Sequence, residues 1–219
     1  MTSLTCLYFA SRIRQRFAYM AIASSVMCFS PITMATDDFE DPKVRIRTLY
    51  ETLRTDLAAE KGLQQCEDDA LKQYMTNKLG DFLSLPNVLG DIGFKLTKER
   101  FAMLPEDQQQ ALQAEFTVTL IKDNLPAIKQ VCAATDLKVL SSEVDYTVSL
   151  VRTSLQTKGK KPIRVDFLLL RGWDHWLIND ILIGKTSLSE RYRASLGPTL
   201  ADEGYAGLHA RLVELNRQP

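Results

Sequence analysis

The sequence predicts an α+β protein in which N-terminal helices cover a four-stranded antiparallel sheet and further helices end the chain. Two observations predict the sheet. Apolar, strand-like runs at residues 163–170 and 176–183 are joined by a short polar connector, and a run rich in Val, Tyr and Thr at residues 144–157 precedes them. Strands joined by such short links pair antiparallel, and no strand–helix–strand alternation is visible.

Helical signals fill the chain before this sheet. A helix is predicted to begin at Asp41, where an N-cap is followed by proline, and to stop at Gly62. A second helix begins after Glu67, with acidic residues in its first turn, and ends at Gly80. Residues 81–104 are strongly apolar but interrupted by proline and glycine, so we expect short, broken helices there.

The remaining elements follow in order. Pro105 opens another helix, in which Pro126 is predicted to cause a kink or a split. The first strand is expected near residues 137–140. Two helices at residues 187–196 and 205–215, separated by glycine and proline, end the chain.

Apolar side chains exceed what such short helices can hide against one another. They either surround an apolar pocket between the helices and the sheet or pack together as a solid core, and both alternatives are open from the pattern alone. If there is a pocket, its predicted lining is Phe82, Leu85, Val88, Ile92, Phe94, Phe101, Phe116, Leu120, Val165, Phe167, Leu169, Trp176 and Ile178.

The first 35 residues have the pattern of a secretory signal peptide. Arg12, Arg14 and Arg16 precede an uncharged apolar run at residues 17–29, and small residues lead up to Ala35. The apolar run is shorter than the roughly 20 residues of a spanning helix. We therefore predict cleavage after Ala35 and one domain over residues 36–219.

Removal of residues 1–35 takes away three arginines and no acid, which leaves 24 basic and 27 acidic residues and a net charge of −3. This charge does not suit a nucleic-acid-binding protein. Cys66 and Cys132 remain, and an oxidising compartment favours a disulfide between them. Two free buried thiols are the alternative.

No catalytic residue, cofactor or metal site is predicted. His175 and His209 have no other His or Cys at ligand spacing. Asp145, Asp166 and Asp180 fall on or near strands, where one of them could act as a base, as in small isomerases with helices over a sheet. Pairing with arginine or capping a strand end is the simpler role for such acids. An enzyme acting on a small apolar ligand is therefore the alternative, not the main hypothesis.

Residues 165–196 carry a recognisable order of motifs: a Val-Asp-aromatic strand, a hairpin with glycine and tryptophan, a strand containing Asp, and Ser-Leu followed by Tyr-Arg. This order resembles the C-terminal block of the MlaC family, the periplasmic phospholipid shuttles also called the toluene-tolerance family. The residues that match are Val165, Asp166, Phe167, Trp176, Asp180, Ser187, Leu188, Tyr192 and Arg193. The chain departs from the family pattern at Asn179, where an aromatic residue is usual.

The resemblance implies a periplasmic carrier, not an enzyme, that holds the acyl chains of a phospholipid in an apolar pocket. It implies transfer of lipid between an outer-membrane lipoprotein complex and an inner-membrane ABC-type lipid transporter. Because the sequence contains no nucleotide-binding site, we expect this exchange to be passive. We expect a monomer, no nucleic-acid partner, and a gate at the broken segment 86–93. A solid-core periplasmic interaction module is the other alternative.

Overall fold

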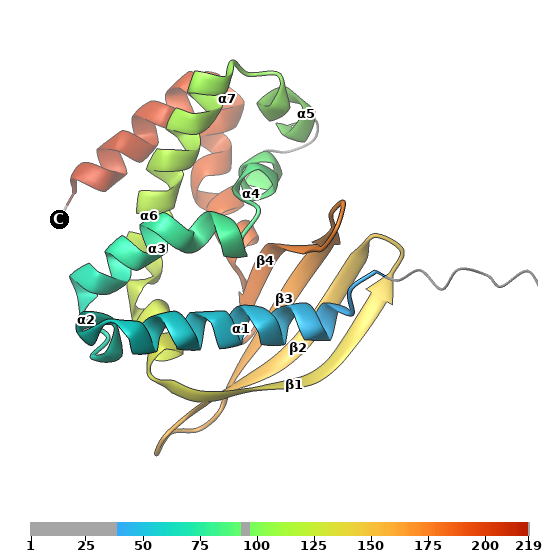
Figure 1. The fold of residues 1–219 in the computed structure, drawn as a ribbon. Helices are drawn as coiled ribbons and strands as arrows, with labels where there is room; N and C mark the ends of the chain where they lie inside the picture. Colours follow the sequence, from blue (N-terminus) through green and yellow to red (C-terminus); the bar gives the residue numbers. More distant parts are fainter. Residues whose placement is uncertain (1–38, 93–96, 219) are drawn as a thin grey trace, which may run out of the picture. The chain divides into compact units, whose positions relative to one another are not determined.

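A computed structural model describes residues 39–92 and 97–218 of the chain (Figure 1). The predicted signal sequence, residues 1–35, and Phe94 lie outside the described residues. The described part has the predicted α+β order of helices, antiparallel strands and helices. Its elements are α1 (Pro42–Ala59), α2 (Lys61–Gln64), α3 (Asp68–Phe82), α4 (Leu85–Ile92), α5 (Thr97–Ala102), α6 (Glu106–Cys132), β1 (Ala134–Asp145), β2 (Val148–Thr157), β3 (Ile163–Arg171), β4 (Trp176–Ile183), β5 (Thr186–Ser187) and α7 (Leu188–Arg217).

The sheet is an antiparallel meander in which each strand pairs with the next, in the order β1-β2-β3-β4-β5. The hairpin formed by β3 and β4 agrees with the prediction. The single strand predicted at residues 144–157 is wrong at its start, because a turn with Tyr146 at φ 46° separates β1 from β2. The predicted sheet of four strands gains β5, a two-residue strand on the edge of β4.

One face of the sheet is buried and receives the helices. Val151 and Leu155 of β2 alternate with more exposed residues, and their register partners in β3, Phe167 and Ile163, point to the same side. Figure 1 shows α1 lying across the strands on this side. The start of α1 is fixed as predicted, because the Asp41 side chain accepts a hydrogen bond of 2.8 Å from the backbone N–H of Lys43.

Trp176 at the start of β4 attaches α1 to the sheet. Its indole Nε1–H donates to the Glu40 carbonyl at 2.7 Å, and its own carbonyl accepts from Arg45 Nε at 3.1 Å. The Phe39 ring meets the indole edge-on, with the ring centroids 5.5 Å apart. The tryptophan of the family block is therefore an anchor for the first helix.

Proline and glycine interrupt the long helices less than predicted. The predicted split at Pro126 is wrong, because α6 continues through it to Cys132. Proline costs a helix roughly 3 kcal/mol, and packing offsets this cost because Ile121 before it and Ile128 after it both join the core. None of the helices in residues 39–92 and 97–218 is both long and apolar enough to cross a bilayer.

The C-terminal helix differs in the same way. Two separate helices were predicted, but α7 runs through Gly197 and Pro198 and changes direction only at Gly204. Gly204 has φ 68° and ψ −164°, a conformation that suits glycine. The predicted boundary at Gly204 is thus a kink, and the one at Gly197 is wrong.

Asp180 ties the start of α7 to the sheet. It is buried on β4, and its Oδ1 accepts from the backbone N–H groups of Ile181 and Ser189, both at 2.9 Å. Its Oδ2 accepts from the Ser187 hydroxyl at 2.5 Å, and the same hydroxyl accepts from the Glu190 N–H at the helix N-terminus. The carboxylate therefore has a structural role, as part of a helix cap.

Replacement of Asp180 by alanine should lower the free energy of unfolding by about 3 kcal/mol, because it leaves two backbone N–H groups and the buried Ser187 hydroxyl without their acceptor. Urea unfolding at pH 7 measures this change. Asp145→Ala is the matched control, since Asp145 is exposed at the end of β1 and its loss should cost no more than about 0.5 kcal/mol. Equal effects of the two substitutions would contradict the capping role.

Candidate functional site

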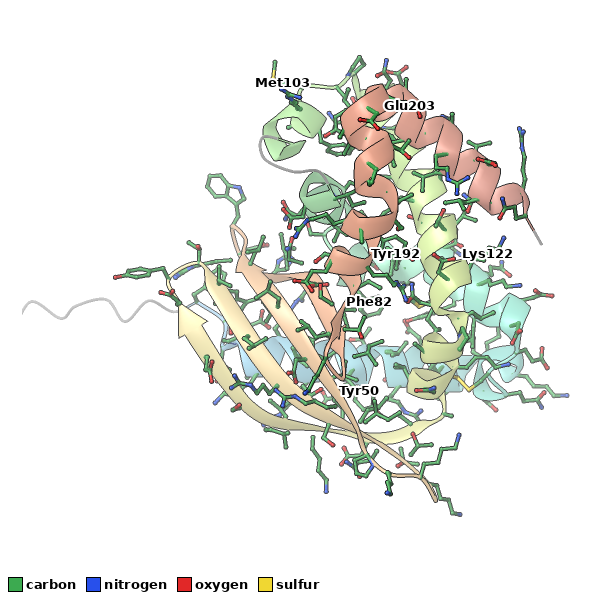
Figure 2. The ribbon with its side chains drawn as sticks, turned by 180° about the vertical axis from the view of Figure 1, so that it is seen from behind. Tyr50, Phe82, Met103, Lys122, Tyr192 and Glu203 are labelled. Carbon is green, nitrogen blue, oxygen red and sulfur yellow. A yellow bond between two sulfur atoms is a disulfide. The ribbon has the colours of Figure 1, made fainter. Side chains whose placement is uncertain are left out.

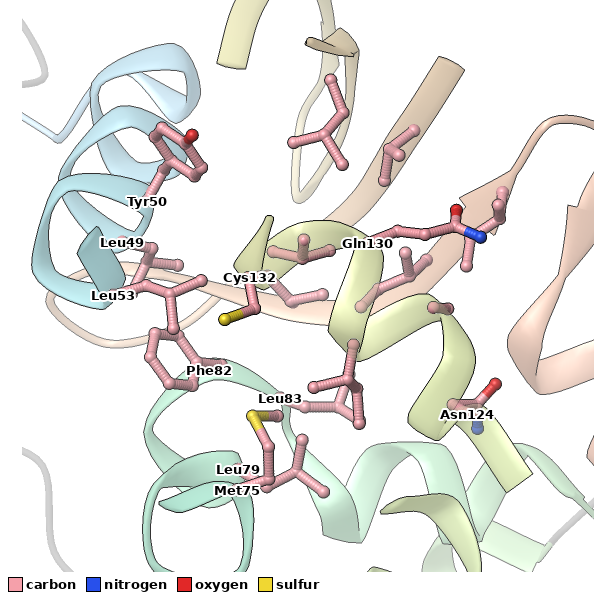
Figure 3. Close-up of a pocket in the computed structure, with 18 of the residues that line it drawn as sticks. Leu49, Tyr50, Leu53, Met75, Leu79, Phe82, Leu83, Asn124, Gln130 and Cys132 are labelled. Atoms are coloured by element: carbon pink, nitrogen blue, oxygen red, sulfur yellow. The ribbon is translucent and has the colours of Figure 1, made fainter. Parts of the chain in front are cut away.

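A cavity of about 220 Å³ lies between the buried face of the sheet and three helices (Figure 3). Its walls come from α1, α3 and the second half of α6, and its floor from strands β1 to β4. The helices contribute Ile46, Leu49, Tyr50, Leu53, Leu57, Leu71, Tyr74, Met75, Leu79, Phe82, Leu120, Ile121, Asn124, Ala127, Ile128, Gln130, Val131 and Cys132. The strands contribute Leu137, Leu155, Ile163, Val165, Phe167, Ile178, Ile181 and Ile183. Leu83 after α3 and Leu188 at the start of α7 complete the lining.

The structure divides the predicted lining residues between two places. Phe82, Leu120, Val165, Phe167 and Ile178 line the cavity. The others that the structure describes are buried in the main hydrophobic cluster and do not line it: Leu85, Val88, Ile92, Phe101, Phe116, Leu169 and Trp176.

That main cluster forms a solid core around α4, the first half of α6 and α7. Phe116 packs edge-on against Tyr192, with centroids 5.2 Å apart, and Phe101 against Tyr205 at 5.9 Å. Figure 2 shows Tyr192 lying between Phe82 and Tyr50 on one side and Met103 and Glu203 at the far end of the helices. The aromatic-rich segment therefore supports the helices beside the cavity and does not surround it.

Sequence reasoning missed most of the helical wall. Leu49, Leu53 and Leu57 recur along one face of α1. This spacing predicts that the face is buried, but it does not tell whether the face meets a cavity or a packed core. Met75 and Leu79 on α3 give the same weak signal. The segment predicted as a gate falls largely on α4, which is buried and lies outside the cavity lining.

The predicted disulfide between Cys66 and Cys132 is present and closes one end of the cavity. Cys66 precedes α3, and Cys132 ends α6, so the bond joins two of the three helical walls. The third wall meets them here as well, because Arg54 Nη1 on α1 donates to the carbonyls of Cys132 and Ala134 at 3.1 and 3.0 Å. An ion pair between Lys129 and Asp68, 2.6 Å apart, spans the same gap at the surface.

A backbone contact closes the other end of α3. The N–H of Ser84 donates to the carbonyl of Ile178 at 2.8 Å, and Leu83 forms an isolated bridge with the same strand residue. Phe82, directly before this contact, lines the cavity. The wall formed by α3 is therefore attached to α6 at its start and to β4 at its end.

Few polar groups reach the lining, and none of the lining residues is an Asp, Glu, Lys or Arg. Tyr74 donates to Asp56 at 2.9 Å, and burial, reinforced by this bond, raises its pKa. Asn124 donates to the carbonyl of Leu120 at 2.7 Å. Burial also raises the pKa of Tyr50, so this phenol stays protonated at neutral pH.

The acids considered as catalytic bases lie elsewhere. Asp180 caps α7, and Asp166 points to the opposite face of the sheet, where Arg164 Nε donates to it at 2.8 Å. Neither residue lines the cavity. An apolar lining without charged side chains is suited to bind a hydrocarbon chain.

Residues 88–214 match the sequence profile of the family described as MlaC protein, which is more than half of the chain. The chain belongs to the MlaC family. The fold is also similar to that of the phospholipid-binding protein from Ralstonia solanacearum, solved in complex with a phospholipid. The TM-score is 0.67 at 20% sequence identity, over 81% of this chain and 97% of that one. No curated protein matches the chain.

The residues of the MlaC block have distinct positions in the structure. Val165, Phe167 and Leu188 line the cavity, whereas Trp176 anchors α1 and Asp180 caps α7. Two further block residues hold α7: Tyr192 donates to Asp123 of α6 at 3.1 Å, and Arg193 donates to the carbonyl of Asp91 at 2.8 Å. Burial raises the pKa of Tyr192 to about 12.

Reduction of the disulfide should destabilise this MlaC-family protein by about 4 kcal/mol, because the bond closes a loop with a sequence separation of 66 residues. Urea unfolding with and without reductant measures the difference. The double variant Cys66→Ser/Cys132→Ser should match the reduced wild type and should not respond to reductant. An unchanged unfolding midpoint on reduction would show that the hydrogen bonds and packing at this end suffice.

Proposed function

We propose that this chain is a periplasmic carrier of phospholipid that holds acyl chain in the cavity and leaves the head group in water. The observation that carries the proposal is the apolar, uncharged cavity between α1, α3, α6 and the sheet. Membership of the MlaC family and the phospholipid bound to the Ralstonia relative support it. A disulfide suits the oxidising periplasm, and so does the secretory pattern of residues 1–35.

The volume of the cavity limits what it holds without rearrangement. An engineered apolar cavity of about 150 Å³ holds one benzene molecule, so about 220 Å³ has room, in proportion, for on the order of nine carbons. At about 0.8 kcal/mol per methylene, that length of chain contributes roughly 7 kcal/mol. A full-length acyl chain requires the walls to move apart.

The lining residues that reach the surface suggest where this opening lies. Gln130 on α6 is exposed, and Ile183 at the end of β4 has 38% of its surface exposed although it lines the cavity. Ala127, Val131 and Ile181 beside them are partly exposed. We place the entrance between the second half of α6 and the end of β4.

Passive exchange follows from the energetics of such a site. A dry, apolar cavity replaces the hydrocarbon environment of the bilayer, so transfer of a chain between them changes the free energy little. We propose that the carrier gives and receives lipid at an outer-membrane lipoprotein complex and an inner-membrane ABC-type transporter, and that these partners determine direction. The two alternatives have less support, because the candidate bases lie outside the cavity and the space between the helices and the sheet is hollow.

Protein purified from the periplasm should carry phospholipid, which native mass spectrometry detects as an added mass and lipid extraction identifies. Protein without lipid should take it up from phospholipid vesicles. A ligand-free protein that also takes up no lipid from vesicles would contradict the proposed function.

Filling the cavity should prevent this binding. Val165 is buried on β3 and lines the cavity, so Val165→Trp places an indole in the space of the acyl chain. We expect lipid uptake from vesicles to fall about tenfold, which corresponds to about 1.4 kcal/mol. Val144→Trp is the control, because Val144 is 56% exposed on β1 and outside the lining. Circular dichroism checks that both variants are folded, and full uptake by folded Val165→Trp would place the lipid elsewhere.

A further inference from the structure

The hydroxyl group of Tyr50 is a buried donor on the wall of the cavity. Its oxygen is inaccessible to solvent, and it has no hydrogen-bond partner among the described residues. Buried hydroxyl groups in native proteins are nearly always paired, because an unpaired one loses its hydration without compensation. An unpaired donor in a ligand cavity therefore suggests an acceptor on the ligand.

The other polar residues of the lining are already satisfied or reach water. Tyr74 donates to Asp56, and the amide of Asn124 donates to Leu120 and accepts from Arg191 at 2.6 Å. Gln130 is exposed. Tyr50 is thus the polar group of the described lining that is available to a molecule inside the cavity.

The position of Tyr50 fixes the depth at which it acts. The residue lies on α1 and packs against the cluster of Ala134, Leu155 and Val165, and as a whole it is only partly buried. Its ring stands at one end of the drawn lining, and Asn124 stands at the other (Figure 3). Arg54, one helical turn further along α1, is exposed. The same cluster includes Val131 and Ile181, which lie beside the proposed entrance, so we place the hydroxyl group near the level where the apolar interior meets water.

In a diacyl phospholipid the groups at this depth are the ester carbonyls, which join the hydrocarbon chains to the part that stays in water. They accept hydrogen bonds and cannot donate, so a protonated phenol complements them. We propose that the Tyr50 hydroxyl donates a hydrogen bond to an ester carbonyl of the bound lipid and makes the protein prefer ester-linked over ether-linked chains. This inference rests on the proposed function.

The preference is measurable by competition. The protein is incubated with vesicles that contain equal amounts of dipalmitoyl phosphatidylglycerol and its dihexadecyl ether analogue, which share head group and chain length. The protein is then separated, and the two lipids that it carries are quantified by mass spectrometry. Wild type should carry on the order of five times more ester than ether lipid, because one neutral hydrogen bond changes an affinity by about that factor.

Tyr50→Phe should carry the two lipids equally. Tyr74→Phe is the matched control, because it removes a phenol from the same lining whose hydrogen bond is made to Asp56. It should keep the preference of wild type. Equal carriage of both lipids by wild type, or a preference that persists in Tyr50→Phe, would overturn the inference and leave the proposed carrier function intact. Failure of wild type to carry either lipid would overturn both.

Thermal unfolding of the lipid-free proteins gives an independent readout. Tyr50→Phe should melt at or above the temperature of wild type, because it removes a buried hydroxyl that has no partner. Tyr74→Phe should melt lower, since it leaves Asp56 without its donor. A clear loss of stability in Tyr50→Phe would show that the protein itself or bound water already satisfies the hydroxyl, and would overturn the assignment to lipid.

Discussion

The helical walls of the cavity are tied together at both ends and, between α1 and α3, by the hydrogen bond from Tyr74 to Asp56, and the hollow depends on these ties. The disulfide between Cys66 and Cys132, with Arg54 bound to the carbonyl of Cys132, holds three helices together at one end. The hydrogen bond from Ser84 to Ile178 holds α3 against the sheet at the other. The aliphatic side chains between these ties surround a cavity of about 220 Å³ and do not fill it.

The main hydrophobic cluster beside the cavity supplies the stability that a hollow interior lacks. Edge-on aromatic pairs, such as Phe116 with Tyr192, are buried between α6 and α7, and the buried cap at Asp180 joins α7 to the sheet. A hollow forgoes dispersion contacts along its walls. Edge-on aromatic pairs therefore fill the interior beside α7, whereas side chains of α1, α3 and α6 leave room for a ligand.

Local chemistry explains which parts of this were predictable from the sequence. The β3–β4 hairpin, the cap at Asp41 and the pairing of the two cysteines follow from short-range patterns or from counting. The predicted helix end at Gly197 is wrong, and of the kink or split predicted at Pro126 the split is absent, because packing outweighs the local cost of proline. Periodicity predicts that Phe82 and Phe116 both point inward. It does not predict that Phe82 lines the cavity whereas Phe116 packs against the Tyr192 ring, since that depends on contacts between residues remote in sequence.

The place of the disulfide in the chain bears on how the molecule is assembled. Cys66 and Cys132 both precede the first strand, so the covalent closure joins segments that are synthesised before any of the sheet. The remaining cysteines, Cys6 and Cys28, fall within the proposed signal sequence. Within residues 36–219, Cys66 and Cys132 have no other cysteine to pair with, so this disulfide requires an oxidant to form but no rearrangement of mispaired cysteines.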